Sequence, residues 1–167
     1  MLETLISVEE YLETSYHPDV DYVDGCIEER NVGEKEHGKC QARVWLLLRR
    51  LRTVKSFIET RVQTSATIYH VPDVCAYGKE PEESVFTQPP LLCVEVLSPQ
   101  DRMSRVMRVV REYRSMGVPT VWILDPLDRR AYVADSNGLH EVTGEIRTAD
   151  GRIALALDEI FSDDEPE

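Results

Sequence analysis

The stretch LLCVEVLSPQDRMSRVMRVVREYRSMGVPTVWILD (Leu91–Asp125) decides the fold class of this chain. It begins and ends with nearly continuous apolar runs, which are typical of strands buried on both faces of a sheet. Ser98-Pro99 ends the first run, and we predict a helix from about Gln100 to Met116, because Gly117 favours the end of a helix. A strand, a helix and a strand in this order predict a right-handed crossover unit.

Segments on both sides of this unit add two helices and several strands. Ser7 followed by Glu10 has the spacing of a capping box and predicts a short helix from about Val8 to Thr14. Apolar residues at helical spacing predict a long helix from about Lys35 to Val54. The segments expected to form strands are DYVDGCIEER (21–30, with a turn at Asp24-Gly25), SFIETRV (56–62), ATIYHV (66–71), VCAY (74–77) and a β-meander over 131–157 with turns at Asn137-Gly138 and Asp150-Gly151. The class is therefore α/β, with a mixed β-sheet core flanked by helices and additional C-terminal β-strands.

Length and composition indicate a single globular domain. With 167 residues, of which 42% are hydrophobic, we expect one domain over residues 1–160 and a disordered acidic tail, FSDDEPE, over 161–167. No apolar run approaches the ~20 residues of a membrane span, and acids stand near the N-terminus where a signal peptide needs basic residues. The four cysteines are scattered and form no CxxC pair, which favours reduced thiols in a cytoplasmic protein: Cys26, Cys40, Cys75 and Cys93.

The charge of the chain argues against a protein that coats DNA without specificity. The net charge is -12, whereas non-specific binding depends on neutralising phosphates. The cations are unevenly spread, however: eight of the 19 Lys and Arg lie between Lys35 and Arg61, and five lie between Arg102 and Arg114. A local basic face on an acidic protein is compatible with this pattern.

Two carboxylates stand inside apolar strands. Asp73 follows Pro72 in the stretch VPDVCAY, and Glu95 lies near the middle of LLCVEVL. A buried carboxylate either stays protonated or meets a cation, and two that converge repel each other unless a divalent ion lies between them. Oxygen-rich sites of this kind suit Mg²⁺ or Mn²⁺. The alternative is that each acid pairs with an arginine or caps a turn at the end of a strand.

The order of several stretches resembles a known family. The stretches DYVDGCIEE, EKEHGKCQARV, YHVPDV, PPLLCVEVLSPQDR and REYRSMGVPTVWILDP resemble the Uma2 (Uma-two) family of bacterial restriction-endonuclease-like proteins, within the PD-(D/E)XK nuclease superfamily. The resemblance covers about Val8 to Pro126. It implies a restriction-endonuclease-like fold, a homodimer, and a metal site formed by Asp73, Glu95 and the main chain of Val96.

The resemblance also directs attention to residues around that site. Related sites carry a lysine where this chain has Leu97, or one on the following helix where it has Val109. Arg105 or Arg108, from a run with an arginine at every third position, would stabilise charge in place of the lysine. The alternative is a solvated helix whose arginines pair with acids, including acids of the N-terminal segment. Two auxiliary residues, Asp21 and His37, stand at positions where the family has an acid and a histidine, and Gln41 would share the helix face of His37. The alternatives are that Asp21 only flanks the turn at Asp24-Gly25 and that His37 caps the helix or lies on the surface.

Two functions agree with these residues. The first is a Mg²⁺- or Mn²⁺-dependent endonuclease that hydrolyses phosphodiester bonds in DNA, with Asp73, Glu95, Arg105 and Arg108 as catalytic residues. The second is a nuclease fold that has lost its chemistry and serves as a DNA- or protein-binding module. The carboxylate pair favours the first function, and the replaced lysines favour the second.

Overall fold

The computed structural model describes residues 4–31 and 33–164. The helices are α1 (Val8–Glu13), α2 (Lys35–Arg50), α3 (Met103–Met116) and α4 (Leu157–Ile160). The strands are β1 (Asp21–Val23), β2 (Cys26–Glu28), β3 (Lys55–Ile58), β4 (Val62–Ser65), β5 (Ile68–His70), β6 (Val74–Tyr77), β7 (Leu92–Val96), β8 (Thr120–Asp125), β9 (Arg130–Asp135), β10 (Gly138–Val142), β11 (Glu145–Arg147) and β12 (Ala154–Ala156).

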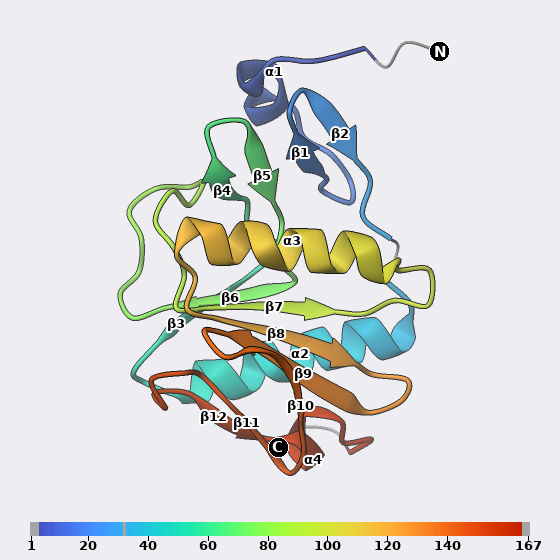
Figure 1. The fold of residues 1–167 in the computed structure, drawn as a ribbon, viewed down its shortest axis with the longest axis vertical. Coiled ribbons are helices and arrows are strands. Elements are labelled where there is room, and N and C mark those ends of the chain that lie inside the picture. Colours follow the sequence, from blue (N-terminus) through green and yellow to red (C-terminus); the bar gives the residue numbers. More distant parts are fainter. Residues whose placement is uncertain (1–3, 32, 165–167) are drawn as a thin grey trace.

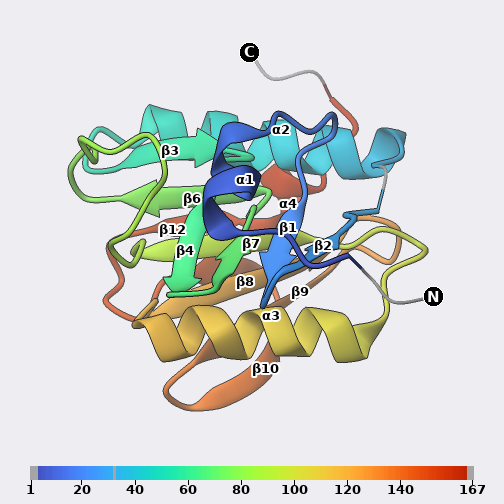
Figure 2. The ribbon, with the colours of Figure 1, turned by 90° about the horizontal axis from the view of Figure 1, so that it is seen from above.

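A six-stranded mixed sheet forms the centre of the molecule, in the order β10-β9-β8-β7-β6-β3 (Figure 1). Strands β7 and β8 are parallel and are joined through α3, as the crossover unit predicts, while the other neighbours are antiparallel. Side chains alternate between the two faces of the sheet. Val94 and Trp122 pack on the α2 side, and Cys93 and Ile123 pack on the α3 side. Figure 2 shows the two helices on opposite sides of the sheet.

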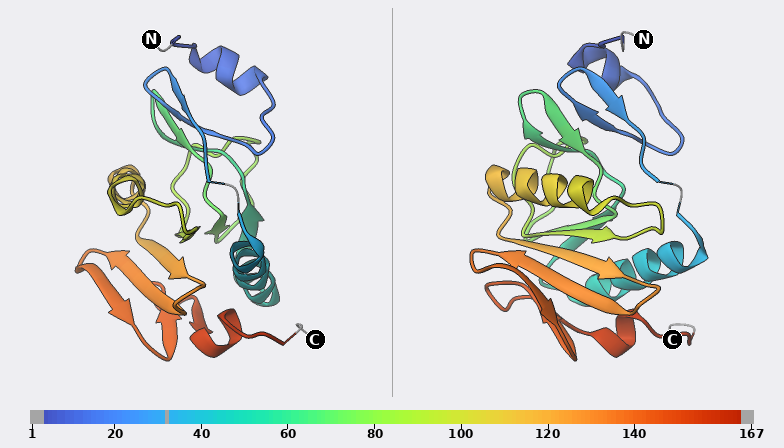
Figure 3. Two further views of the ribbon diagram at one scale, coloured as in Figure 1. Left: turned by 90° about the vertical axis from the view of Figure 1, so that its right-hand side faces the viewer. Right: turned by 45° about the vertical axis from the view of Figure 1, so that its right-hand side comes forward.

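A smaller four-stranded sheet, β2-β1-β5-β4, lies at one end of the molecule together with α1 (Figures 1 and 3). Helix α1 begins at Ser7, whose hydroxyl accepts a hydrogen bond from the Glu10 amide at 3.1 Å, as expected for an N-cap. Its Tyr11 ring packs against the rings of Tyr22 and Tyr69 from this sheet. The small sheet supplies two side chains to the site described below: Asp21, the first residue of β1, and His70, the last residue of β5.

The predicted fold class is confirmed, with three local differences. SFIETRV is not one strand but two, since Glu59 has a positive φ of 46° and directs β3 and β4 into different sheets. The predicted helices over Lys35–Val54 and Gln100–Met116 are shorter, because the chain turns after Arg50 and because Asp101 binds back to Ser98 before α3 begins. The C-terminal meander also divides, because β11 and β12 form a separate pair.

The remaining expectations concern the tail, the thiols and membrane segments. Residues 162–164 contact Arg43 and Arg129, while residues 165–167 of the expected tail lie outside the described residues. All four cysteines are described and none forms a disulfide. The described part of the chain contains no helix with the length and hydrophobicity that a membrane span requires.

Candidate active site

The two strand carboxylates lie next to each other on the α3 side of the large sheet. Strands β6 and β7 pair in a register that places Val74 opposite Val94, so the residue before the first, Asp73, lies beside the residue after the second, Glu95. Both side chains line one small cavity of about 30 Å³. Their strands therefore direct two carboxylates to one point, at the edge where the small sheet meets the large one.

Asp73 is buried, with a relative exposure of 3%, and donors surround its carboxylate. The Val96 amide donates to Oδ2 at 2.7 Å, and Arg30 Nη2 donates to Oδ1 at 2.8 Å. His37 Nε2 lies 3.4 Å from the same Oδ1. Burial opposes a charge on Arg30, but the negative charges of Asp73 and Glu95 outweigh it and raise the pKa of the guanidinium. The carboxylate of Asp73 thus has a donor at each oxygen, and one of these donors is a guanidinium.

Glu95 has a different environment and a different charge state. Burial disfavours its ionised form, and the neighbouring charge of Asp73 adds to this effect. Arg30 and a 2.8 Å hydrogen bond from the Tyr113 hydroxyl to Oε1 act in the opposite direction, but the pKa of Glu95 still rises to about 8. At neutral pH Glu95 is therefore mostly protonated, and a cation that binds to it would displace its proton.

Helix α2 supplies both auxiliary residues that follow from its sequence. Burial lowers the pKa of His37, but the hydrogen bond to Asp73 and the charge of Asp73 raise it by more, so that the net shift is upward. Gln41, one turn later, donates to the main-chain oxygen of Asp73 at 3.0 Å and to Glu59 Oε1 at 3.3 Å. His37 therefore contacts the carboxylate of Asp73, and Gln41 holds the main chain of Asp73.

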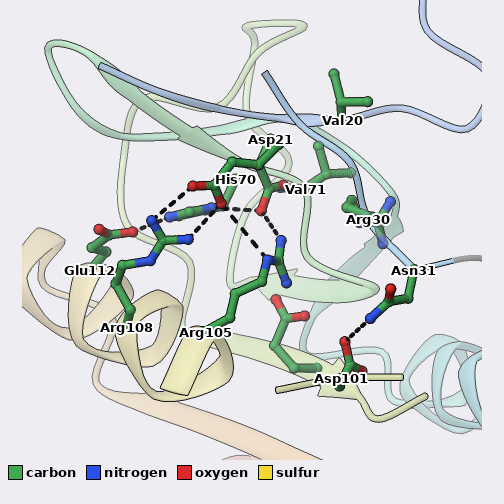
Figure 4. Close-up of polar contacts among 12 residues, drawn as sticks. Val20, Asp21, Arg30, Asn31, His70, Val71, Asp101, Arg105, Arg108 and Glu112 are labelled. Carbon is green, nitrogen blue, oxygen red and sulfur yellow. Dashed lines mark hydrogen bonds and ion pairs between the residues drawn. The ribbon is translucent and has the colours of Figure 1, made fainter. Parts of the chain in front are cut away.

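Asp21 anchors a second group of charges beside the pair (Figure 4). Its Oδ2 lies 2.9 Å from His70 Nδ1 and accepts a hydrogen bond from Arg105 Nη2 at 2.7 Å, while its Oδ1 accepts from the Val71 amide at 2.9 Å. His70 is fully buried, and its Nε2 contacts Glu112 of α3. Burial raises the pKa of Asp21, but His70 and Arg105 lower it more strongly. Asp21 thus positions Arg105, which lines the carboxylate cavity.

The arginines of α3 do not all reach the site. Arg105 lines the cavity, whereas Arg108 forms two hydrogen bonds to Glu28, at 2.9 and 2.5 Å, and lines an adjoining hollow of about 580 Å³ together with Arg102 and Arg105. Arg114 donates to main-chain oxygens beyond the end of the helix. Of the two arginines predicted to act in catalysis, Arg105 is the one beside the carboxylates.

Comparison with known proteins decides the family. A family model described as "Uma2: Putative restriction endonuclease" matches residues 8–157. The chain belongs to the Uma2 family. The resemblance seen in the sequence is thereby confirmed, and it extends through the C-terminal strands.

A solved structure shares the Uma2 fold seen here. The crystal structure of a "putative nuclease belonging to DUF820" from Anabaena variabilis superimposes with a TM-score of 0.83, covering 94% of this chain and 98% of that chain. The two sequences are 18% identical, so this likeness bears on the fold alone. No curated protein matches the chain.

The oxygen atoms of this Uma2 site fit a small hard cation. The described residues contain no cluster of three or more His, Cys, Asp and Glu that could hold a metal ion. Mg²⁺, however, is commonly bound through one or two carboxylates while it retains several waters. Asp73 and Glu95 supply two carboxylates. The main chain of Val96 already turns its amide toward Asp73, so its carbonyl is expected on the same side of the strand.

Both positions where related sites carry a lysine are apolar in this Uma2 member. Leu97 is half-buried among the residues under α3. Val109 is 3% exposed and lies four residues after Arg105 and four before Tyr113, on the helix face that turns toward the site. Among the described residues, those that line the carboxylate cavity include two arginines and a histidine but no lysine.

Four residues of the site were not predicted from the sequence. Nothing marked three of them as site residues, although two lie in the family stretches YHVPDV and REYRSMGVPTVWILDP: Arg30, His70 and Glu112. Each acquires its role through a partner more than 40 residues away along the chain. The fourth, Tyr113, belongs to the REYRSMGVP stretch, and its buried hydroxyl next to Glu95 could have been suspected from the need of a buried tyrosine for a partner.

Proposed function

We propose that this chain is an endonuclease that hydrolyses phosphodiester bonds in DNA with the help of Mg²⁺ or Mn²⁺. One observation carries the proposal: two carboxylates converge from adjacent strands, and the pKa of Glu95 is raised to about 8 by burial and by Asp73. Membership of the Uma2 family and the nuclease-like fold support the same reaction class.

The residues around the pair have separate roles in this proposal. Asp73, Glu95 and the main chain of Val96 would hold the ion, and a bound ion would lower the pKa of a water and stabilise charge on the phosphate. Arg105 presents a fixed guanidinium at the cavity, suited to the oxygens of a phosphate. It remains protonated and so stabilises charge without acting as a base. Arg108 contributes from the adjoining hollow, where the flanking backbone of the DNA would lie.

Two observations also favour a second candidate function. No lysine lines the cavity among the described residues, and Arg30 already neutralises Asp73. A protein that binds DNA or another protein through the same fold, without cleavage, agrees with both facts. Fold alone does not separate the two functions.

Plasmid nicking in Mn²⁺ separates them. We expect weak nicking by the parent protein, none by Asp73→Asn, and parental nicking by the control Asp128→Asn, which alters an exposed acid in the turn after β8. Val109→Lys is expected to nick on the order of a hundredfold faster, because it returns a cation to the face of α3 beside Glu95.

The outcomes are distinct. Cleavage that persists in Asp73→Asn would reveal a contaminating nuclease and remove the assignment. No cleavage by any variant, with Mn²⁺ bound normally by the parent, would establish the binding function instead.

A further inference from the structure

Arg30 occupies the site in a way that its place in the sequence does not suggest. It lies in the irregular segment between β2 and α2, and its guanidinium is 2.8 Å from Asp73 Oδ1. The side chain of Arg30 is 13% exposed and that of Asp73 is 4% exposed. Arg30 therefore places a positive charge on the carboxylate that the proposed function assigns to the metal ion.

Arg30 and a divalent ion would compete for the same carboxylate. Asp73 Oδ1 accepts a hydrogen bond from Arg30, and Asp73 Oδ2 accepts one from the Val96 amide. His37 Nε2 lies a further 3.4 Å from Oδ1. An ion that binds to Asp73 therefore requires Arg30 to withdraw from Oδ1.

The segment that carries Arg30 allows such a movement. Neither a helix nor a strand holds Arg30, and its neighbour Asn31 anchors the segment separately through a 2.6 Å hydrogen bond to Asp101. The side chain can therefore turn away while the backbone stays attached. A guanidinium that leaves a carboxylate retains its donors, and phosphate oxygens match its geometry.

We propose that Arg30 is an internal counter-cation that gives up Asp73 to the divalent ion and then binds a phosphate of the DNA. This inference rests on the proposed function and adds to it a coupling between the binding of the metal ion and the binding of DNA. Because Arg30 exchanges one anionic partner for another, metal ion and DNA bind cooperatively. Linkage requires that each raises the affinity for the other by the same factor.

Calorimetric titration with Mn²⁺ tests the exchange without measuring cleavage. We would compare the parent, Arg30→Gln and Arg30→Lys, each with and without a short DNA duplex whose phosphorothioate linkages resist hydrolysis. Without DNA, Arg30→Gln should bind Mn²⁺ more tightly by on the order of tenfold, because the competing charge is gone. Arg30→Lys should bind with an intermediate affinity, and this variant keeps the charge if Arg30→Gln folds poorly.

The duplex provides the second measurement. It should tighten Mn²⁺ binding by the parent severalfold and leave the affinity of Arg30→Gln unchanged. Arg130→Gln is the matched control, since Arg130 forms an exposed two-bond ion pair with Glu141 on β9 and β10. It should behave like the parent in both titrations.

Two results would contradict the inference. One is unchanged or weaker Mn²⁺ binding by Arg30→Gln and Arg30→Lys, and the other is equal tightening by the duplex in the parent and in Arg30→Gln. Asp73→Asn separates this failure from that of the proposed function. If Asp73→Asn binds Mn²⁺ like the parent, then the metal site itself is wrongly assigned, whatever Arg30 does.

Discussion

Replacing His70 with glutamine should make the stability of the protein less dependent on pH. His70 lies between Asp21 of β1 and Glu112 of α3, with Arg105 on the far side of Asp21 and the Tyr113 ring 5.7 Å from the imidazole. Burial lowers the pKa of His70, but hydrogen bonds and charges from the two carboxylates raise it from 6.5 to about 9. The imidazolium thus bridges the small sheet and the helix that covers the large one.

The sign and size of the effect follow from these values. A histidine whose pKa rises on folding stabilises the protein fully below its unfolded pKa, and this stabilisation is lost as the pH rises through the folded pKa. A rise from 6.5 to about 9 corresponds to about 3 kcal/mol at 1.36 kcal/mol per unit. The difference in unfolding free energy between parent and His70→Gln should therefore shrink by about 3 kcal/mol between pH 6 and pH 9.5.

Urea unfolding in a chelating buffer at four pH values between 6 and 9.5 measures this difference. Thermal unfolding should show it as a change of roughly 6–12 °C in the separation of the two melting temperatures. The control is His140→Gln, which removes an exposed histidine from the edge strand β10 and should follow the parent at every pH. A separation of parent and His70→Gln that stays constant over this range would show that His70 is neutral in the folded protein and would refute the argument.

Two further predictions concern Glu95 and assembly. The pKa of Glu95 is raised from 4.5 to about 8, so the folded state loses stability relative to the unfolded state as the pH rises from 4.5 to 8. Glu95→Gln can keep the Tyr113 hydrogen bond, and it should melt at a higher temperature than the parent at pH 8 in EDTA and close to the parent at pH 5. A lower melting temperature of Glu95→Gln at pH 8 would contradict this. The protein is also predicted to form a homodimer at micromolar concentration, which light scattering would contradict by showing a 19.2 kDa species alone. The contact is expected at the open edge of β10, where Leu139 is 44% exposed.

The central part of the fold could be predicted because its sequence signals are local. The apolar runs of β7 and β8, with a glycine-terminated helix between them, leave few alternatives. The division of SFIETRV could not be predicted, because a positive φ at Glu59 has no signature in a glutamate. The separate pairing of β11 and β12 likewise depends on tertiary packing, since Ile146 and Leu155 join the buried cluster that contains Trp122 and Val133, and no strand propensity reports this.

The site could be predicted where a charged residue stands in an apolar segment of the sequence. Asp73 and Glu95 stand out because a charge in an apolar strand is costly, and this holds whatever the rest of the chain does. Arg30 and His70 do not stand out, because an arginine beside acids and a histidine at the end of a strand are ordinary in any sequence. Their roles depend on distances of 2.8 and 2.9 Å to residues that the fold brings together.

The pairing of the arginines explains how an acidic protein could act on DNA. The sequence shows two clusters of cations, but near the site each arginine already has a carboxylate: Arg30 with Asp73, Arg105 with Asp21, and Arg108 with Glu28. A phosphate that approaches this surface meets paired charges and must displace an acid from its partner. A divalent ion that binds to Asp73 and Glu95 would change this balance, because it would compensate Asp73 and release the guanidinium of Arg30. The affinity for DNA would then depend on the bound metal ion more than on the net charge of -12.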